Sequence, residues 1–212
     1  MSKKLTALAL VLCLMAAFAA CGKKNDEKPT EAPSATATPT DATQPTDTPT
    51  PTEDAKPAYA NAVAVLDAVW STLSDDEGFA AVGGSFMNPV DNAPGAIDLA
   101  EKDTFTNNLL IPADVQDKLV DVASLTHMMN ANTYTSAAIK VDGMDAKTVA
   151  SKIEASFLGT QFVCGIPDKI AIASVDGYVV YAFGAADLVD DMMKRYAALN
   201  GGALLADKNF EN

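Results

Sequence analysis

The stretch KIAIASVDGYVVYAF, residues 169–183, decides the fold of this chain. Two runs rich in Ile, Val and aromatic residues flank the pair Asp176-Gly177. An Asp-Gly pair between two such runs is the strongest short-range signal for a β-hairpin. The stretch therefore predicts two antiparallel strands, 169–175 and 178–183, joined by a tight turn.

A second pair of strands and two helices surround this hairpin. Residues 120–129 and 133–141 are predicted to be strands joined by a short loop. Asp145 suits the N-cap of a helix over 145–158, and a second helix is predicted over 186–199. The apolar stripes comprise Val149, Ile153 and Phe157 in the first helix, and Leu188, Met192, Tyr196 and Leu199, with Val189 and Met193 beside them, in the second.

The elements follow the order strand, strand, helix, and this order occurs twice. Two ββα units naturally form a four-stranded antiparallel sheet with both helices on one face, which is a two-layer α+β fold. We assign this ββαββα core to residues 113–200. Residues 58–112 are predicted to add an N-terminal helical segment and loops, so that 58–200 form one globular domain. Residues 201–212 are predicted to be a tail.

The segment before the core is predicted to be mostly irregular. Apolar residues recur at helical spacing through 58–74 and predict one helix. Gly and Pro residues scattered over 78–95 predict loops. Shorter helices are predicted near 97–102 and over 111–119, the second with Pro112 in its first turn.

Residues 1–20 are predicted to be a lipoprotein signal peptide. Two lysines supply a positive start, residues 5–18 form an apolar run, and small residues precede Cys21. This pattern suits a peptidase that cuts before a cysteine already carrying a diacylglycerol. Cys21 is therefore the predicted lipidation site and mature N-terminus, with acyl chains such as palmitate. Phe18 departs from the pattern, because lipoproteins usually carry Leu or another aliphatic residue there.

Two other fates are consistent with the same residues. The ordinary signal peptidase recognises an A-x-A pattern such as 17–19, and cleavage there would release a soluble protein. An uncleaved anchor is the other alternative, but the apolar run is shorter than the roughly 20 residues that a membrane-spanning helix needs. The small residues before Cys21 favour lipidation over both.

Residues 22–57 are predicted to be a disordered tether. Pro, Thr, Ala, Asp and Glu dominate, as in the stretch TPTPT at 48–52, and no large apolar residue occurs. Such a composition cannot build a core. Extended as polyproline II, at about 3.1 Å per residue, the segment would reach on the order of 100 Å. It is interpreted either as a spacer that holds the domain away from the membrane or as a linker of no required length.

The second half of the chain resembles a family of small lipoproteins of Gram-positive anaerobes, catalogued as a domain of unknown function, serial 4358. The resemblance rests on Met128-Met129-Asn130, the strand AIKV at 138–141 with the helix after it, and the strand GYVVY at 177–181 with its terminal helix. It covers residues 109–199. The family has no established activity or ligand, so the resemblance assigns no functional residue. It implies a location in a Gram-positive cell envelope, on the outer face of the cytoplasmic membrane.

The composition excludes some classes of partner. The chain has 28 acidic and 15 basic residues and a net charge of −13. Nucleic-acid binding depends on Lys and Arg that neutralise phosphates, so we expect no nucleic-acid partner. The acidic clusters at 75–78 and 142–145 lack the ligand spacing of calcium loops, and we expect no metal site or cofactor.

No residue is assigned a catalytic role. His127 is the single histidine, so a thiol hydrolase would have to pair it with Cys164. The soft ligands at 127–129, together with Met144 or 192–193, would suit Cu(I), although core packing explains the methionines better. The leading hypothesis is a binding or sensing module that is anchored through acylated Cys21 in the lipid bilayer and meets an envelope protein or wall component. A small extracytoplasmic hydrolase acting on envelope material is the alternative.

Overall fold

The computed structural model describes residues 58–163 and 165–210, and the structural statements below concern these residues. The predicted signal peptide and tether, Cys21 and Cys164 lie outside them. The described helices are α1 (Ala62–Trp70), α2 (Lys102–Asn107), α3 (Ala113–Gln116), α4 (Ala146–Leu158) and α5 (Ala186–Ala197). The described strands are β1 (Ala81–Ser85), β2 (Asn88–Asp91), β3 (Gly95–Ala96), β4 (Leu119–His127), β5 (Tyr134–Val141), β6 (Lys169–Val175), β7 (Tyr178–Gly184) and β8 (Ala203–Asn209).

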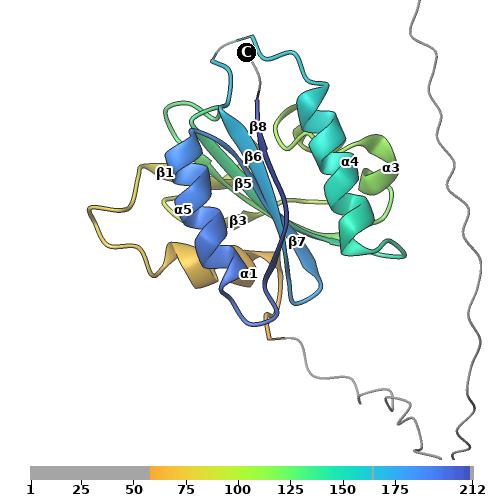
Figure 1. Cartoon of the computed structure of the whole chain (residues 1–212), viewed down its shortest axis with the longest axis horizontal. Coiled ribbons are helices and arrows are strands. Elements are labelled where there is room, and N and C mark those ends of the chain that lie inside the picture. The colour runs from red at the N-terminus through yellow and green to blue at the C-terminus, as the bar shows by residue number, and fades with distance from the viewer. Residues whose placement is uncertain (1–57, 164, 211–212) are drawn as a thin grey trace, which may run out of the picture. The chain divides into compact units, whose positions relative to one another are not determined.

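The α+β class and the four predicted strands are confirmed. The strands form one antiparallel sheet in the order β2-β1-β4-β5-β7-β6-β8, and β3 also pairs with β4 (Figure 1). The predicted strands are β4 to β7, which lie next to one another in the sheet. Asp176-Gly177 forms the predicted turn between β6 and β7. Asp145 caps α4 as expected, because its Oδ1 accepts a hydrogen bond from the Thr148 backbone N–H at 3.0 Å.

The prediction that both helices lie on one face of the sheet is wrong. Along β7, Val180 belongs to the core cluster of α1 and α5, whereas its neighbours Val179 and Tyr181 belong to the cluster of α4. The helices therefore cover both faces, as Figure 1 shows.

The cause lies in the connections between strands. Helix α4 connects β5 to β6 and α5 connects β7 to β8, and each crossover passes one strand in the same direction across the sheet. The starting strands β5 and β7 run antiparallel to each other. Because crossovers of this kind are right-handed, the two helices must lie on opposite faces.

The sheet also has eight strands in the described residues, not four. Three of the additional strands fall in the segment predicted as loops. There β1 and β3 share one edge of β4, since Gly83 pairs with Leu125 and Gly95 pairs with Ser124. A Cβ atom on Gly83 would lie 2.2 Å from the backbone nitrogen of Gly95. These glycines therefore permit close approach of two backbones within the sheet and do not mark loops.

The segment predicted as a tail contains the edge strand β8. It pairs with β6 from Lys169 to Ser174, with an irregularity between Ile172 and Ala173. Such a bulge breaks the alternation of side chains between faces. For this reason the stretch ALLADKN does not show the regular pattern of a strand.

The positions of the short helices were predicted less well than those of the long ones. The helix expected near 97–102 is α2, which begins at Lys102. The helix expected over 111–119 is α3, a single turn whose N-cap is Pro112. The helix expected over 58–74 is α1, which ends at Trp70.

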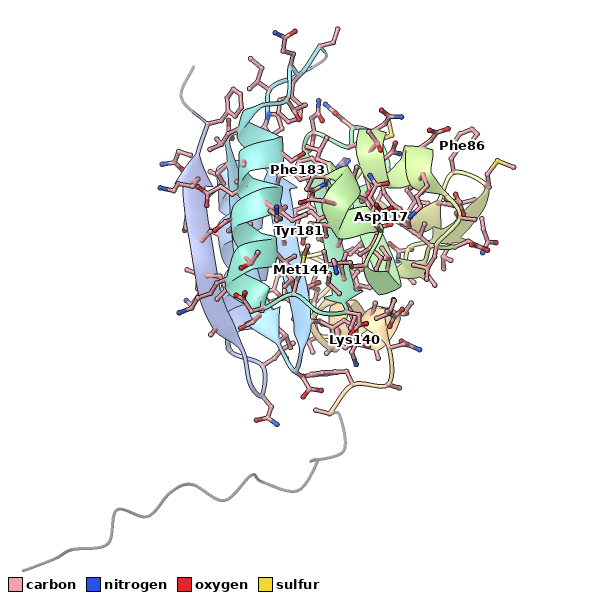
Figure 2. The ribbon with its side chains drawn as sticks, turned by 90° about the vertical axis from the view of Figure 1, so that its right-hand side faces the viewer. Phe86, Asp117, Lys140, Met144, Tyr181 and Phe183 are labelled. Carbon is pink, nitrogen blue, oxygen red and sulfur yellow. The ribbon has the colours of Figure 1, made fainter. Side chains whose placement is uncertain are left out.

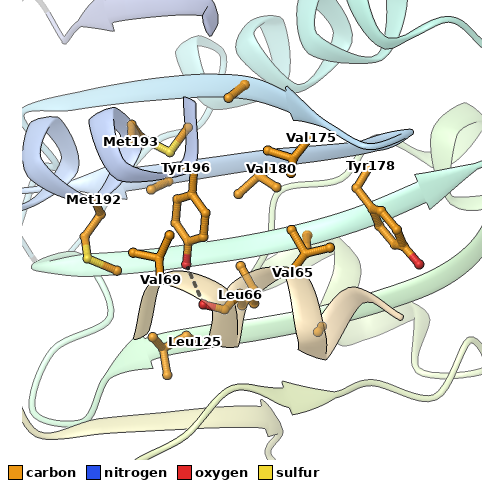
Figure 3. Close-up of a cluster of buried hydrophobic side chains, with 14 of the residues drawn as sticks. Val65, Leu66, Val69, Leu125, Val175, Tyr178, Val180, Met192, Met193 and Tyr196 are labelled. Carbon is orange, nitrogen blue, oxygen red and sulfur yellow. Dashed lines mark hydrogen bonds between the residues drawn. The ribbon is translucent and has the colours of Figure 1, made fainter. Parts of the chain in front are cut away.

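One core cluster joins α1 and α5 to the sheet (Figure 3). The Tyr196 hydroxyl of α5 donates a hydrogen bond to the Leu66 carbonyl oxygen of α1 at 3.3 Å. Buried side chains of these two helices are Ala62, Val65, Leu66, Val69, Val189, Met192, Met193 and Tyr196. This bond and the packing around it connect two helices that are far apart in the sequence.

The other core cluster lies under α4. The predicted stripe of Val149, Ile153 and Phe157 is buried. The ring of Phe157 lies within 5.6 Å, centroid to centroid, of Phe183 from β7. Figure 2 shows Tyr181 and Phe183 between α4 and α3. This aromatic cluster supports the end of the sheet where β7 finishes.

An ion pair connects the turn after α1 to α5. Glu77 Oε1 lies 2.6 Å from Arg195 Nη2, and the Ser74 backbone N–H donates to Glu77 Oε2. The hydrogen bond from the Ser74 backbone, followed by that from Arg195, lowers the pKa of Glu77 from 4.5 to about 2. Because this pKa is lowered by folding, Glu77 stabilises the fold above about pH 4.5 and loses that contribution as the pH falls toward 2.

We expect Glu77→Gln to lower the free energy of unfolding at neutral pH, because the neutral amide loses the charge that attracts Arg195. The difference from the unsubstituted chain should shrink as the pH falls from 4.5 to 2. Chemical denaturation at a series of pH values measures it. Asp91→Asn is the control, since Asp91 is exposed and forms no ion pair with a described residue. A difference that stays constant over this range would contradict the assignment.

Candidate binding pocket at one end of the sheet

The two ends of the sheet differ in character. We call one the entry end, because the described chain begins there: the Ala58 backbone N–H donates to Asp176 Oδ2, in the β6–β7 turn, at 2.6 Å. We call the other the loop end. It consists of 128–133 after β4, Val163, and 165–168 before β6. In Figure 1 the β6–β7 turn lies at the bottom of the view and the loop after α4 lies at the top.

Large apolar side chains are exposed at the loop end. Met129 is 81% exposed and Val163 is 93% exposed. Met128 and Ile166 at the same end are also exposed, as is Leu158, the last residue of α4. Clustered exposed apolar residues indicate an interaction surface more strongly than isolated ones do.

A pocket of about 340 Å³ opens at the loop end. Its walls come from three segments: Asn107 and Asn108 at the end of α2, Asn132 in the β4–β5 loop, and Thr160 and Gln161 after α4. All of these side chains are amides or hydroxyls. Among the described residues that line the pocket, none is charged.

The floor of the pocket is formed by buried residues of the sheet. Thr135 of β5 is 1% exposed and Phe183 of β7 is 3% exposed. The Thr135 hydroxyl donates to the Ala131 carbonyl at 2.9 Å. Asn132 Nδ2 donates to the Gly165 carbonyl at 2.7 Å and so joins the two loops. The pocket is therefore held in shape by the sheet below and by a bond between loops above.

The backbone beside the pocket is strained. Leu110, a lining residue, has a φ of +56°. This left-handed conformation costs a branched L-residue about 1–2 kcal/mol. The buried Tyr181 hydroxyl stabilises it by donating to the carbonyl of Leu109 at 2.8 Å. Strained residues of this kind cluster at functional sites, which makes this pocket the leading candidate.

Tyr181 and Tyr134 provide a matched test of this support. Tyr181→Phe leaves the buried Leu109 carbonyl without its partner, so we expect the free energy of unfolding to fall by about 1–3 kcal/mol. The buried hydroxyl of Tyr134 has no hydrogen-bond partner among the described residues. We therefore expect Tyr134→Phe to be neutral or to stabilise by about 1 kcal/mol. Urea denaturation measures both, and equal losses in the two variants would contradict the difference in hydrogen bonding.

A larger hollow of about 500 Å³ lies beside Trp70 and is more open to solvent. Trp70 Nε1 donates to the Asn92 carbonyl at 3.0 Å, and the Trp70 ring contacts Phe79 edge to face. These two contacts of Trp70 therefore fix the neighbouring segments that contain Asn92 and Phe79. Asp67 and Asp75 also line this hollow. It does not combine a buried floor with exposed apolar neighbours, and we rank it second.

The residues considered for chemistry in the sequence do not gather at the pocket. The ring of His127 stacks on Phe79 with centroids 5.3 Å apart, and its Nδ1 accepts from the Met129 backbone N–H at 3.2 Å. Met144 packs against the α4 cluster near the entry end, and Met192 and Met193 are buried in the cluster of α1 and α5. No group of three or more His, Cys, Asp or Glu in 58–163 and 165–210 is arranged to hold a metal. Pairing of His127 with Cys164 stays untested, because Cys164 lies outside the described residues.

Sequence reasoning missed the residues that line the pocket. Asn107, Asn108 and Gln161 fall in segments between predicted elements, and surface amides are common there. The positive φ of Leu110 has no sequence signal at all, because Leu rarely adopts it. Only the meeting of three loops distinguishes these residues from other polar surface residues.

No family model, curated protein or solved structure matches the chain. Within the described part of the chain, no helix is both long enough and apolar enough to span a bilayer. A functional conclusion for this protein therefore rests on the chemistry of its own residues.

Proposed function

We propose that the chain is a lipid-anchored binding module of a Gram-positive cell envelope that presents the loop end of its sheet to an envelope protein or wall component. One observation carries the proposal. The described chain begins at the entry end, whereas the uncharged pocket and the strongly exposed side chains of Met129 and Val163 lie at the opposite end. Attachment at the entry end leaves the loop end accessible to a partner.

The anchor is supported by the N-terminal sequence. An apolar run and small residues precede Cys21, and a Pro/Thr-rich segment long enough to act as a spacer follows it. The resemblance of residues 109–199 to a lipoprotein family agrees with this location. The acidic net charge of −13 argues against direct contact of the domain with an anionic membrane surface, which fits a domain held at a distance.

The pocket favours binding over hydrolysis. Hydrolysis by side chains needs a nucleophile with an adjacent base, or a pair of carboxylates. The described lining consists of amide, hydroxyl, aliphatic and phenyl groups. Amides and hydroxyls donate and accept hydrogen bonds without changing protonation near neutral pH. These groups are suited to hold a ligand in one orientation.

We expect Cys21→Ala to abolish incorporation of an alkyne-labelled fatty acid into the protein. The thioether that carries the diacylglycerol requires the cysteine sulfur, and alanine has none. Metabolic labelling followed by fluorophore coupling and electrophoresis measures the acyl label. Cys164→Ala is the matched control and should keep the full signal. Equal labelling of the original chain and Cys21→Ala would overturn the lipid anchor.

Site-specific photo-cross-linking in intact cells tests the binding face. A photoreactive amino acid is placed at Met129 or Val163 of the loop end, or at Val120, which is the second residue of β4 at the entry end and is 50% exposed. All three are exposed apolar positions, so Val120 controls for non-specific contacts of apolar surface residues. We expect a discrete cross-linked product from the loop-end positions and none from Val120. Cross-links from Val120 alone, or equally from all three positions, would contradict the proposed face.

A further inference from the structure

We propose that the pocket at the loop end binds an uncharged, hydroxyl-rich ligand, namely a saccharide. This inference rests on the proposed function and specifies the ligand class of the same site. It is drawn from the charge of the lining, the supply of hydrogen-bonding groups and the nature of the floor.

The described lining of the pocket is uncharged. The chain has a net charge of −13, yet none of the described residues lining this pocket is acidic or basic. A charged ligand that enters a pocket must be compensated by an opposite charge or lose much of its hydration energy. This pocket offers no such compensation. An uncharged ligand avoids the penalty.

The rim of the pocket carries several hydrogen-bonding groups. Asn107, Asn108 and Gln161 each carry an amide with two donors and a carbonyl acceptor, and none of these side chains bonds to another described residue. The amides come from two separate segments and line one pocket. A ligand with several hydroxyl groups, each both donor and acceptor, matches such a set. A purely apolar ligand would leave these groups unpaired.

The base of the pocket contains phenyl rings. Phe183 is buried at the base of the pocket, and the half-buried Phe162 lies 6.5 Å from it, ring centroid to ring centroid. Phenyl faces pack well against the C–H side of a sugar ring, while the amides at the rim reach its hydroxyls. The volume of about 340 Å³ falls within the usual range of ligand pockets, roughly 300–1,000 Å³. The same site therefore supplies an apolar base and a polar rim.

Two matched trisaccharides test the ligand class. The probe is the trimer of N-acetylglucosamine, which is uncharged, and the comparison is the trimer of glucosamine, which has the same skeleton but carries ammonium groups. Titration calorimetry uses the full chain in detergent. General electrostatic attraction to an acidic protein would favour the cationic trimer. The pocket should instead favour the uncharged trimer by about tenfold or more.

Variants locate the site. We expect the double variant Asn108→Ala with Gln161→Ala to weaken binding of the uncharged trimer by about tenfold or more, because two hydrogen bonds are lost. Asn88→Ala removes an exposed amide in the β1–β2 hairpin and should leave binding unchanged. Circular dichroism confirms that each variant is folded. Tyr181→Phe is a second test of the site. It removes the hydrogen bond to the Leu109 carbonyl next to Leu110 but keeps every side chain that lines the pocket, so it should also weaken binding of the uncharged trimer.

Three outcomes would overturn the saccharide assignment: no binding of the uncharged trimer, tighter binding of the cationic trimer, or an equal loss in the Asn88 and the pocket variants. The proposed function fails separately. If cross-linking from Val163 succeeds while the trimer does not bind, the binding face stands and the ligand class is wrong. If neither experiment succeeds, both proposals are wrong.

Discussion

A chain with Gly184→Ala is expected to lose more than about 4 kcal/mol of unfolding free energy, which is most of the stability of an ordinary domain. Gly184 has a φ of +146°, and a Cβ atom there would lie 2.2 Å from the Thr133 carbonyl oxygen. Neither backbone can move aside. Gly184 pairs with Tyr134 of β5 and with Lys169 of β6, so strands on both sides hold it.

The control for this substitution is Gly177→Ala in the β6–β7 turn. Gly177 also has a positive φ, +80°, but a Cβ atom there would have nothing within 4 Å. We expect this variant to cost only about 1–2 kcal/mol, the price of the left-handed backbone alone. Urea denaturation followed by circular dichroism compares the two. Similar losses for both glycines would show that crowding at Thr133 is not the dominant effect.

Removal of residues 203–212 is expected to destabilise the domain by more than about 3 kcal/mol and to cause aggregation. Strand β8 pairs with β6 from Lys169 to Ser174. Without it, one hydrogen-bonding edge of β6 is unpaired, and Leu205, Ala206 and Phe210 no longer pack on the cluster under α4. An uncovered strand rich in Ile and Ala is a template for pairing with other chains.

The variant Asp207→Asn distinguishes the contribution of the ion pair on β8 from that of the strand pairing. Lys169 is 7% exposed, and its Nζ lies 2.8 Å from Asp207 Oδ1 and 2.5 Å from Asp190 Oδ1. Because Asp190 remains and the carboxylates are partly exposed, we expect this variant to lose only about 1 kcal/mol or less. Equilibrium denaturation gives the stabilities, and light scattering gives the aggregation. If the truncated chain stays monomeric and loses no more unfolding free energy than Asp207→Asn, then β8 is dispensable.

The elements predicted correctly are those with strong local signals. The Asp176-Gly177 turn and the stripe of Val149, Ile153 and Phe157 depend on residues a few positions apart, and the structure confirms both. Strand β8 and strands β1 to β3 were missed for opposite reasons. A bulge hides the alternation in β8, while Gly83 and Gly95 suggest loops although they serve close backbone contact.

The candidate site could not be predicted in the same way. Its amides belong to segments separated by a strand pair and a helix, and nothing in their local sequence marks them. Even the support of the pocket is long-range, since Tyr181 and Leu109, which share a buried hydrogen bond, are 72 residues apart. The sequence could assign His127 and the methionines only by residue type, and those residues serve packing and the surface.

The sequence alone determined the α+β class and the four central strands, which the structure confirms, and it predicts an export signal and a tether that lie outside the described residues. These features depend on composition, on periodicity and on one two-residue turn, all of which act over short distances. The face that each helix covers, the closure of the sheet edge by β8 and the uncharged pocket depend on folding. They arise because the direction of each strand and the hand of each crossover bring distant segments together, and that geometry is a property of the assembled sheet.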